Sequence, residues 1–295
     1  MSRLLVLGAA GMLGHKLCQL LPPMGFETVA TVRKPVELYT SHAGVFSGVE
    51  LIDGVDAFDF ESTEAVITAK APDAVVNCIG IIKQRREAKN PLVSIEINSL
   101  LPHRLAALCQ RIGARLVQIS TDCVFSGQKG SYDESDESDA RDLYGRTKFL
   151  GETTEEETAA ITLRTSIVGR EISEVKHGLF EWFLSQTERA GNTISGFEKA
   201  IYTGFTTNEM ARIIAMVLRE HRQLTGVHHV ASEPINKFEL LCMVKDAMGL
   251  DIEIEPDSEF VCDRSLVMDR FADATGYVAP SWREMIREFS VSCDA

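Results

Sequence analysis

Short apolar runs alternate with stretches of helical periodicity over the first 166 residues. Six apolar runs predict strands, at residues 3–8, 27–33, 48–60, 73–80, 114–121 and 160–166. Helical patterns separate them, and the longest covers "SIEINSLLPHRLAALCQRIG" at residues 94–113. Near-continuous apolar strands that alternate with helices are typical of a parallel sheet buried on both faces. The expected fold class is therefore α/β, with a doubly wound parallel sheet.

The pattern changes after residue 166. A strand–helix signal returns once, at residues 202–221, whereas residues 167–201 and 222–295 show short, irregular elements. We expect residues 1–166 and 202–221 to form the sheet domain. The other two segments would form a smaller C-terminal lobe. That lobe would close a cleft over the carboxyl ends of the strands, where open α/β sheets bind their ligands.

A glycine-rich turn follows the first strand. Gly8, Gly11 and Gly14 form a GxxGxxG pattern around Met12 and Leu13, at the start of the first helix. Such glycines allow a tight turn and a close approach of the backbone to a pyrophosphate. The N-terminus of the helix adds free N–H groups and the positive end of a dipole. The turn predicts a Rossmann-type dinucleotide site.

The residues after the second strand bear on the choice of cofactor. An acidic residue here would bind the ribose 2′-hydroxyl of NAD, whereas an arginine would accommodate the 2′-phosphate of NADP. The chain has Arg33 and Lys34, so NADPH is expected, with NADH the less favoured alternative. Further residues expected to face the cofactor are Asp59 after the third strand and Asn77, Cys78 and Gly80 at the end of the fourth.

A polar cluster closes the fifth strand, at Ser120, Thr121 and Asp122. Tyr144 and Lys148 follow on one face of a predicted helix, one turn apart. The Thr121 hydroxyl can donate to a carbonyl oxygen, and the Tyr144 phenol can protonate it. A neighbouring ammonium should lower the pKa of the tyrosine. With a hydride from the cofactor, this set predicts the reduction of a carbonyl group.

These motifs together resemble the extended short-chain dehydrogenase/reductase family, and most closely its dTDP-4-dehydrorhamnose reductase branch. The resemblance rests on "GAAGMLG", "STDCVFSGQKGSYDE", "YGRTKFLGE" and "LRTSIVG", and more loosely on later segments up to "DRSLVMDRFADATGY". It implies that Thr121, Tyr144 and Lys148 are catalytic. It also implies that Asn98 orders a helix and a proton-relay water near Lys148, and that the substrate is a nucleotide-linked 4-keto-6-deoxyhexose.

The chain departs from that branch beside the expected sugar. Position 123 is Cys where the rhamnose reductases usually carry Tyr, and "HGLFEWF" lacks the expected Asn. We expect Asp122 and Cys123 to contact the sugar. The candidate phosphate ligands are Lys83, Lys176 and Arg264, with Arg85 and Arg86 as further cations.

Two other functional classes fit a chain of this kind. Sugar-nucleotide dehydratases resemble one another in carrying a second acid after the threonine, and this chain has Cys123 there; the 4-epimerases usually carry a Ser-rich segment in place of Ser-Thr-Asp. The regulatory β subunit of methionine adenosyltransferase also resembles this branch and acts by binding a partner. An intact Thr121, Tyr144 and Lys148 set favours catalysis, and the product would serve the synthesis of cell-surface polysaccharide precursors.

The charge, hydropathy and cysteine content of the chain restrict the classes of binding partner. The net charge of −13 argues against a nucleic-acid or anionic membrane surface. No apolar run approaches the ~20 residues of a membrane span. The seven cysteines form no CxxC pair, which fits a reducing cytoplasm and predicts neither disulfides nor a metal site. The expected partner is a small-molecule nucleotide sugar, and the candidate assembly is a homodimer.

Overall fold

A central parallel sheet dominates the computed structural model, which describes residues 2–153, 160–173, 176–187 and 191–292. Its strands are β1 (Arg3–Leu7), β2 (Glu27–Thr31), β3 (Val49–Ile52), β4 (Ala74–Asn77), β5 (Arg115–Ile119), β6 (Ala160–Arg164) and β10 (Gly226–His229). They lie in the order β10-β6-β5-β4-β1-β2-β3, and every pairing is parallel. The predicted Rossmann-type fold class is confirmed.

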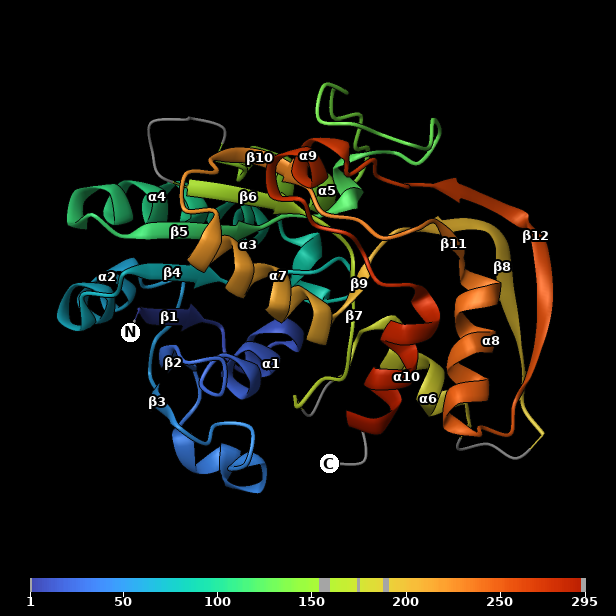
Figure 1. The fold of residues 1–295 in the computed structure, drawn as a ribbon, viewed down its shortest axis with the longest axis horizontal. Coiled ribbons are helices and arrows are strands. Elements are labelled where there is room, and N and C mark those ends of the chain that lie inside the picture. Colours follow the sequence, from blue (N-terminus) through green and yellow to red (C-terminus); the bar gives the residue numbers. More distant parts are fainter. Residues whose placement is uncertain (1, 154–159, 174–175, 188–190, 293–295) are drawn as a thin grey trace.

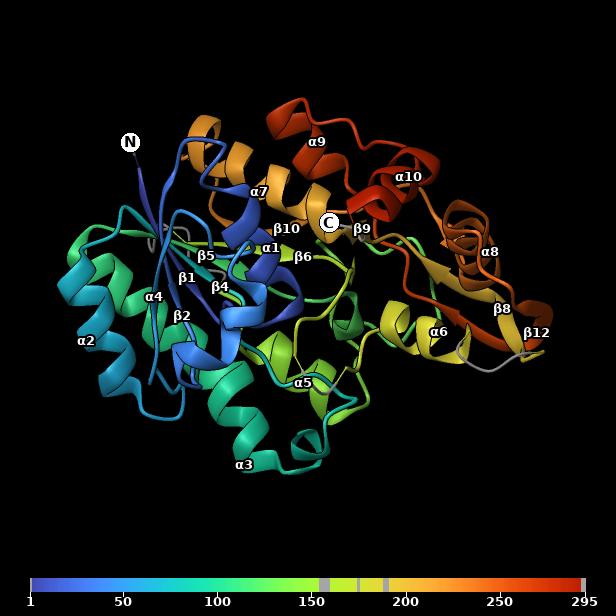
Figure 2. The same ribbon diagram turned by 90° about the horizontal axis from the view of Figure 1, so that it is seen from below.

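Helices cover both faces of this sheet (Figure 2). One face carries α1 (Met12–Leu20) and α7 (Thr207–Glu220), and the other carries α2 (Phe60–Lys70) and α4 (Leu101–Ile112). Alternate residues of β1 enter the two cores, Leu4 and Val6 on the α1 side and Leu5 and Leu7 on the α2 side. Side chains alternate across a strand, so the uninterrupted apolar run is the sequence signature of a strand buried on both faces.

The strand order leaves a crevice at the carboxyl end of the sheet. β1 lies between β2 and β4, and the chain winds outward from it in both directions. Connections after β1 and β4 therefore leave on opposite faces and separate at their carboxyl ends, which is where such sheets bind ligands. The glycine turn after β1 and the polar residues after β4 and β5 all open onto this edge.

A smaller lobe lies beside the sheet (Figure 1). It holds the three-stranded sheet β11-β8-β12 with helices α6, α8 and α10. The bounds are β8 (Thr193–Tyr202), β11 (Ile235–Asn236), β12 (Glu253–Asp263), α6 (Leu179–Thr187), α8 (Lys237–Met248) and α10 (Trp282–Ser292). A two-stranded pair, β7 (Ile167–Val168) with β9 (Phe205–Thr206), lies where the chain leaves and re-enters the large sheet.

The remaining elements are short. They are η1 (Val36–His42), η2 (Arg86–Lys89), α3 (Pro91–Ser94), the π-helix η3 (Ile95–Leu100), η4 (Asp122–Val124), α5 (Leu143–Leu150) and α9 (Asp269–Thr275). The single long helix predicted at 94–113 is therefore interrupted by a π-helical turn, which ends just before Pro102 in the first turn of α4. π-helical turns occur frequently at functional sites.

One strand of the central sheet was missed. Residues 226–229 fall in a segment that the sequence assigned to the smaller lobe, yet they form β10 beside β6. Four residues containing two histidines are too short and polar for a recognisable apolar run. The limits of the two domains remain a prediction. Among the described residues, no helix is long and apolar enough to cross a membrane. Cys293 lies outside the described part of the chain, and the other cysteines are free thiols.

Candidate active site

A cavity of about 440 Å³ opens at the carboxyl ends of β1, β4 and β5 and reaches β8 and β12 of the smaller lobe. It brings together most of the side chains predicted from sequence. Thr121, Tyr144 and Lys148 line it together with Met12 of the glycine turn and Arg264 of the lobe. The cavity therefore joins the expected cofactor and substrate ends.

The glycine turn has little room for side chains. Gly8 has φ +81°, and a Cβ on Gly14 would lie 2.2 Å from the Gly8 carbonyl oxygen. Gly11 is the N-cap of α1, and no side chain caps that helix. The first N–H groups of a helix have no partner within it, so those of Met12 and Leu13 stay available at the cavity wall. This backbone arrangement fits a dinucleotide pyrophosphate.

The residues expected near the adenosine lie outside the cavity. Arg33 and Lys34 follow β2 and are exposed, at the place where a bound adenosine ribose would lie in this fold. Asp59 is the N-cap of α2, and its carboxylate accepts a hydrogen bond from the Ser62 N–H at 3.4 Å. The local structure thus gives Asp59 a capping role, and no contact of Asp59 with the cavity is seen.

Residues after β4 line the cavity and are held from behind. Asn77 is buried, its amide donates to the Gln118 side chain at 2.8 Å, and with Cys78 and Gly80 it faces the cavity. Asn98 fixes the loop that follows. It accepts from the Ile81 N–H at 2.9 Å and donates to the Ile81 carbonyl at 3.0 Å. The described contacts of Asn98 are structural, since its side chain does not line the cavity.

The end of β5 positions Thr121 beside Tyr144. The Thr121 hydroxyl donates to Asp122 Oδ1 at 3.1 Å and accepts from the Cys123 N–H at 3.1 Å. Burial raises the pKa of Tyr144, as does the nearby Cys123, while a hydrogen bond between the Tyr144 and Thr121 side chains opposes that rise. Tyr144 therefore keeps its proton at neutral pH.

Lys148 does not act on Tyr144 as the sequence suggested. Its ammonium donates to the Ile119 carbonyl at 2.6 Å, and burial lowers the pKa of Lys148 to about 8, against the charge of Glu152. Tyr144 has a raised pKa, not a lowered one, because loss of water outweighs its neighbours. The expected depression of the tyrosine pKa by this lysine is therefore wrong for this structure.

Cations gather at the lobe side of the cavity. Lys83 approaches the Cys123 sulfur at 3.9 Å, Arg264 donates from Nε to the Phe125 carbonyl at 2.8 Å, and Lys237 lies at the start of α8. All three line the cavity, and within the described residues no salt bridge joins any of them to a carboxylate. Burial lowers the pKa of Lys237, with Lys83 adding to the effect and Asp122 opposing it.

Other predicted cations are placed elsewhere. Lys176 forms an ion pair with Glu181 at 2.9 Å and does not line the cavity. Arg85 lines the cavity, whereas Arg86 lies in η2 outside it. Lys237 and His177 also line the cavity, and the sequence analysis identified neither of them. One feature of the sequence could have drawn attention to Lys237. It is a cation at the first position of a helix, where it opposes the helix dipole.

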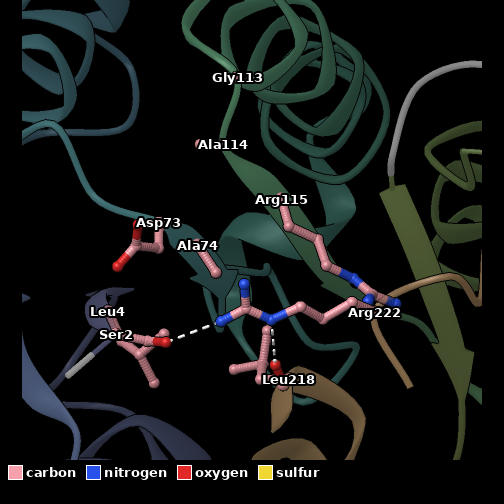
Figure 3. Close-up of a pocket in the computed structure, with 9 residues that line it drawn as sticks. All are labelled: Ser2, Leu4, Asp73, Ala74, Gly113, Ala114, Arg115, Leu218 and Arg222. Atoms are coloured by element: carbon pink, nitrogen blue, oxygen red, sulfur yellow. Dashed lines mark hydrogen bonds between the residues drawn. The ribbon is translucent and has the colours of Figure 1, made fainter. Parts of the chain in front are cut away.

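Figure 3 shows another hollow, of about 170 Å³, at the amino ends of the strands. There Arg222 donates to the Ser2 hydroxyl at 2.8 Å and to the Leu218 carbonyl at 3.0 Å. Arg115 donates to the His221 carbonyl at 2.9 Å. Both guanidinium groups tie the end of α7 to the sheet, on the side away from Thr121. In the described part of the chain, no group of three or more His, Cys, Asp or Glu could hold a metal ion.

Comparisons with known proteins agree with this geometry. The family described as "RmlD substrate binding domain" matches residues 2–292. The spore coat polysaccharide biosynthesis protein SpsK of Bacillus subtilis (strain 168) is 27% identical over the whole of both chains. A dTDP-4-dehydrorhamnose reductase of Streptomyces griseus is 32% identical over 51% of this chain and 43% of its own.

A solved structure shares the fold over nearly all of the chain. The dTDP-4-dehydrorhamnose reductase from Bacillus anthracis str. Ames, solved in complex with NADP, has a TM-score of 0.79 and 21% identity, covering 99% of both chains. The family match spans almost every residue, including the glycine turn and the Thr121, Tyr144 and Lys148 set. The chain belongs to the RmlD substrate binding domain family, the dTDP-4-dehydrorhamnose reductase-like branch of the extended short-chain dehydrogenase/reductases.

Proposed function

We propose that the protein uses NADPH to reduce the C4 ketone of a nucleotide-diphospho-4-keto-6-deoxyhexose. The observation that carries the proposal is one cavity lined by Thr121, Tyr144 and Lys148 together with the glycine turn. Ketone reduction requires a hydrogen-bond donor, a proton donor and a cation beside a dinucleotide site. All of these lie at one edge of the sheet.

The three side chains have separate roles in this reaction. Thr121 turns its hydroxyl from Asp122 Oδ1 to the ketone oxygen. Tyr144, protonated at neutral pH, gives its proton to that oxygen as it becomes a hydroxyl. Lys148, which lines the same cavity, would stabilise the negative charge that develops on the phenol during the reaction, and this role requires the ammonium form. Because the pKa of Lys148 is about 8, the rate should fall as pH rises through that value.

The cofactor proposed is NADPH, which when bound supplies the hydride to the ketone carbon. The N–H groups of Met12 and Leu13 would hold its pyrophosphate, and Gly8, Gly11 and Gly14 keep the approach clear. Arg33, exposed after β2, would bind the 2′-phosphate, with Lys34 beside it. A guanidinium forms paired hydrogen bonds with phosphate.

Lys83, Lys237 and Arg264 would hold the diphosphate of the substrate. Asp122 acts electrostatically on Lys237 and Arg264, and Asp142 acts on Arg264. Within the described residues, neither carboxylate forms an ion pair with any of the three cations. Unpaired cations inside a cavity are costly unless an anion joins them. A sugar diphosphate offers that anion a few bonds from the ketone. The lack of carboxylate partners within the described residues thus supports an anionic substrate.

The resemblance to the rhamnose reductases puts Cys123 where those enzymes usually carry a tyrosine, and the smaller side chain would leave more space beside the sugar. Burial raises the pKa of Cys123 to about 12, so the thiol stays neutral, and a thiol donates only weak hydrogen bonds. The freed volume favours a bulkier group on the sugar. We propose a UDP-linked 2-acetamido-4-keto-6-deoxyhexose as a substrate at least as good as the dTDP-linked rhamnose precursor, in the synthesis of cell-surface polysaccharide precursors.

The test is NADPH oxidation by purified protein against a panel of 4-keto sugar nucleotides. Tyr144→Phe keeps the ring and removes the proton, so kcat should fall by ~10²–10⁴ while NADPH binding survives. A near-normal kcat in this variant would contradict the tyrosine's role. A clear preference for the dTDP-linked rhamnose precursor would contradict the argument from Cys123 and leave the reductase proposal intact.

The alternative is a regulatory subunit that binds NADP without turnover. It would be favoured by tight NADPH binding together with no oxidation of the cofactor by any substrate in the panel. A dehydratase is disfavoured by Cys123 in place of the second acid. Release of water from an NDP-hexose, in the absence of a ketone, would bring that class back.

A further inference from the structure

A buried ion pair lies directly behind the catalytic edge of β5. Glu152 and Arg164 are each 4% exposed, and neither lines the cavity. Arg164 donates from Nε to Glu152 Oε1 at 2.9 Å and from Nη2 to Oε2 at 2.7 Å. This two-bond fork fixes the carboxylate in position and orientation.

The same carboxylate holds the residue before Thr121. Ser120 is buried, and its hydroxyl donates to Glu152 Oε1 at 2.5 Å. Its N–H donates to the Leu163 carbonyl at 2.8 Å. Ser120 is thus fixed through both its backbone and its side chain, and the Thr121 hydroxyl extends into the cavity from the next residue.

Arg164 is itself fixed on its other sides. Its Nη1 donates to His229 Nε2 at 3.1 Å, and the guanidinium carbon lies 5.3 Å from the centre of the Phe125 ring. Burial and the charge of Arg164 lower the pKa of His229 to about 4. The imidazole is therefore neutral, accepts at Nε2, and donates from Nδ1 to the Tyr132 carbonyl at 3.1 Å.

Glu152 also acts electrostatically on Lys148. It follows Lys148 by four residues, just beyond the end of α5, where its N–H donates to the Phe149 carbonyl at 3.1 Å. Three influences act on that ammonium: burial opposes its charge, while Glu152 and Cys78 favour it. Burial raises the pKa of the Cys78 thiol, so Cys78 carries no charge at neutral pH. Tyr144, one turn away on α5, is likewise neutral. Glu152 is the charged carboxylate that acts on Lys148.

We propose that Glu152 is a positioning residue that fixes Thr121 through Ser120 and whose charge, set in place by Arg164, keeps Lys148 an ammonium ion. The inference rests on the proposed reduction for the role of Lys148, but the ionisation of Lys148 can be measured without any turnover. Glu152 contacts neither the cavity nor the expected substrate, so its effect is indirect.

The first experiment is Glu152→Gln, read by the pH dependence of acetylation of Lys148 with acetic anhydride and peptide mass mapping. Removing the charge should lower the pKa of Lys148 by about one unit. Glu209→Gln is the matched control. Glu209 is also a buried carboxylate in an ion pair, with Arg212. It lies in α7 and is not among the charges that act on Lys148, so its variant should leave the Lys148 titration unchanged.

Two further variants separate the charge role from the positioning role of Glu152 and control for misfolding of the single variant. Glu152→Gln combined with Arg164→Met removes both members of the ion pair, so no guanidinium is left buried without its carboxylate. The Lys148 titration should move as in the single variant. Ser120→Ala removes the hydrogen bond and keeps the charge. It should leave the Lys148 titration unchanged, while kcat falls by roughly 10-fold to 100-fold through misplacement of Thr121.

The outcomes distinguish the inference from the proposed function. If the Lys148 titration stays at its wild-type position in both Glu152 variants, the charge role is overturned, and an unchanged kcat in Ser120→Ala overturns the positioning role. If the titration moves but no 4-keto sugar nucleotide is reduced, the proposed function fails and the inference stands. With turnover, the basic limb of the pH profile of kcat/KM should move to lower pH together with the Lys148 titration.

Discussion

The two ends of the cavity are built in different ways. At the β1 end, backbone N–H groups and the absence of side chains at Gly8, Gly11 and Gly14 make the expected cofactor site. At the lobe end, the charged tips of Lys237 and Arg264 come from segments far apart in the chain. The first site is local in sequence and the second exists only after folding. A single added methyl group in the glycine turn should therefore abolish cofactor binding. At the lobe end, removal of one cation at a time should weaken substrate binding in steps.

The largest expected effect is that of Gly14→Ala. The new Cβ would lie 2.2 Å from the Gly8 carbonyl oxygen and 2.9 Å from the Ala9 Cα. These are backbone atoms of the turn itself, so the turn must open. We expect about 3 kcal/mol less stability and loss of measurable NADPH binding, by denaturant unfolding and fluorescence titration. Gly44→Ala is the control, because its Cβ would meet nothing within 4 Å. Equal behaviour of the two variants would contradict the close-approach argument.

The lobe end should respond in smaller steps. Lys237→Met and Arg264→Met each remove one cation from the wall of the cavity, and each should raise KM for the sugar nucleotide by ~10–100-fold, the value of a charge-assisted hydrogen bond. KM for NADPH should stay unchanged. Arg86→Met removes a cation of η2 that does not line the cavity and should leave both values near wild type. A rise in KM for NADPH in the Lys237 variant would place that lysine at the cofactor.

Arg33 tests how far the cofactor site extends beyond the backbone. Arg33→Ala should raise KM for NADPH by about 10-fold, as expected for an exposed guanidinium–phosphate contact. KM for NADH should hardly change, because that cofactor has no 2′-phosphate. Steady-state kinetics with both cofactors measures the difference. If the wild type already prefers NADH, Arg33 is a surface residue.

The smallest effect concerns Asp59, which the sequence predicted to face the cofactor and which caps a helix in the structure. Asp59→Ala should cost roughly 0.5–1 kcal/mol of stability and leave NADPH binding unaltered. Thermal unfolding and NADPH titration of the same preparation separate the two roles. Weaker NADPH binding at unchanged stability would restore the original assignment.

The sequence predicted the parts of the molecule that depend on local pattern. The first six strands, the glycine turn and the Tyr144–Lys148 pair all follow from periodicity and spacing. The structure places the turn and the pair at the carboxyl edge of the sheet that these strands form. Lys237 was missed because a cation at the first position of the helix in "INKFELL" does not show that this helix begins at the cavity. The pKa of Tyr144 was wrong in direction because burial, which a sequence does not display, outweighs a neighbouring charge.

The late position of β10 in the chain has a consequence for folding. β10 completes the central sheet beside β6, yet β7, α6, β8, β9 and α7 lie between them in sequence. Closing so long a loop delays the pairing. Until it forms, β6 presents an open edge that can pair with another chain. During synthesis, a chain that has not yet reached Gly226 therefore exposes the edge of β6. Pairing of β10 with β6 then protects this edge against aggregation.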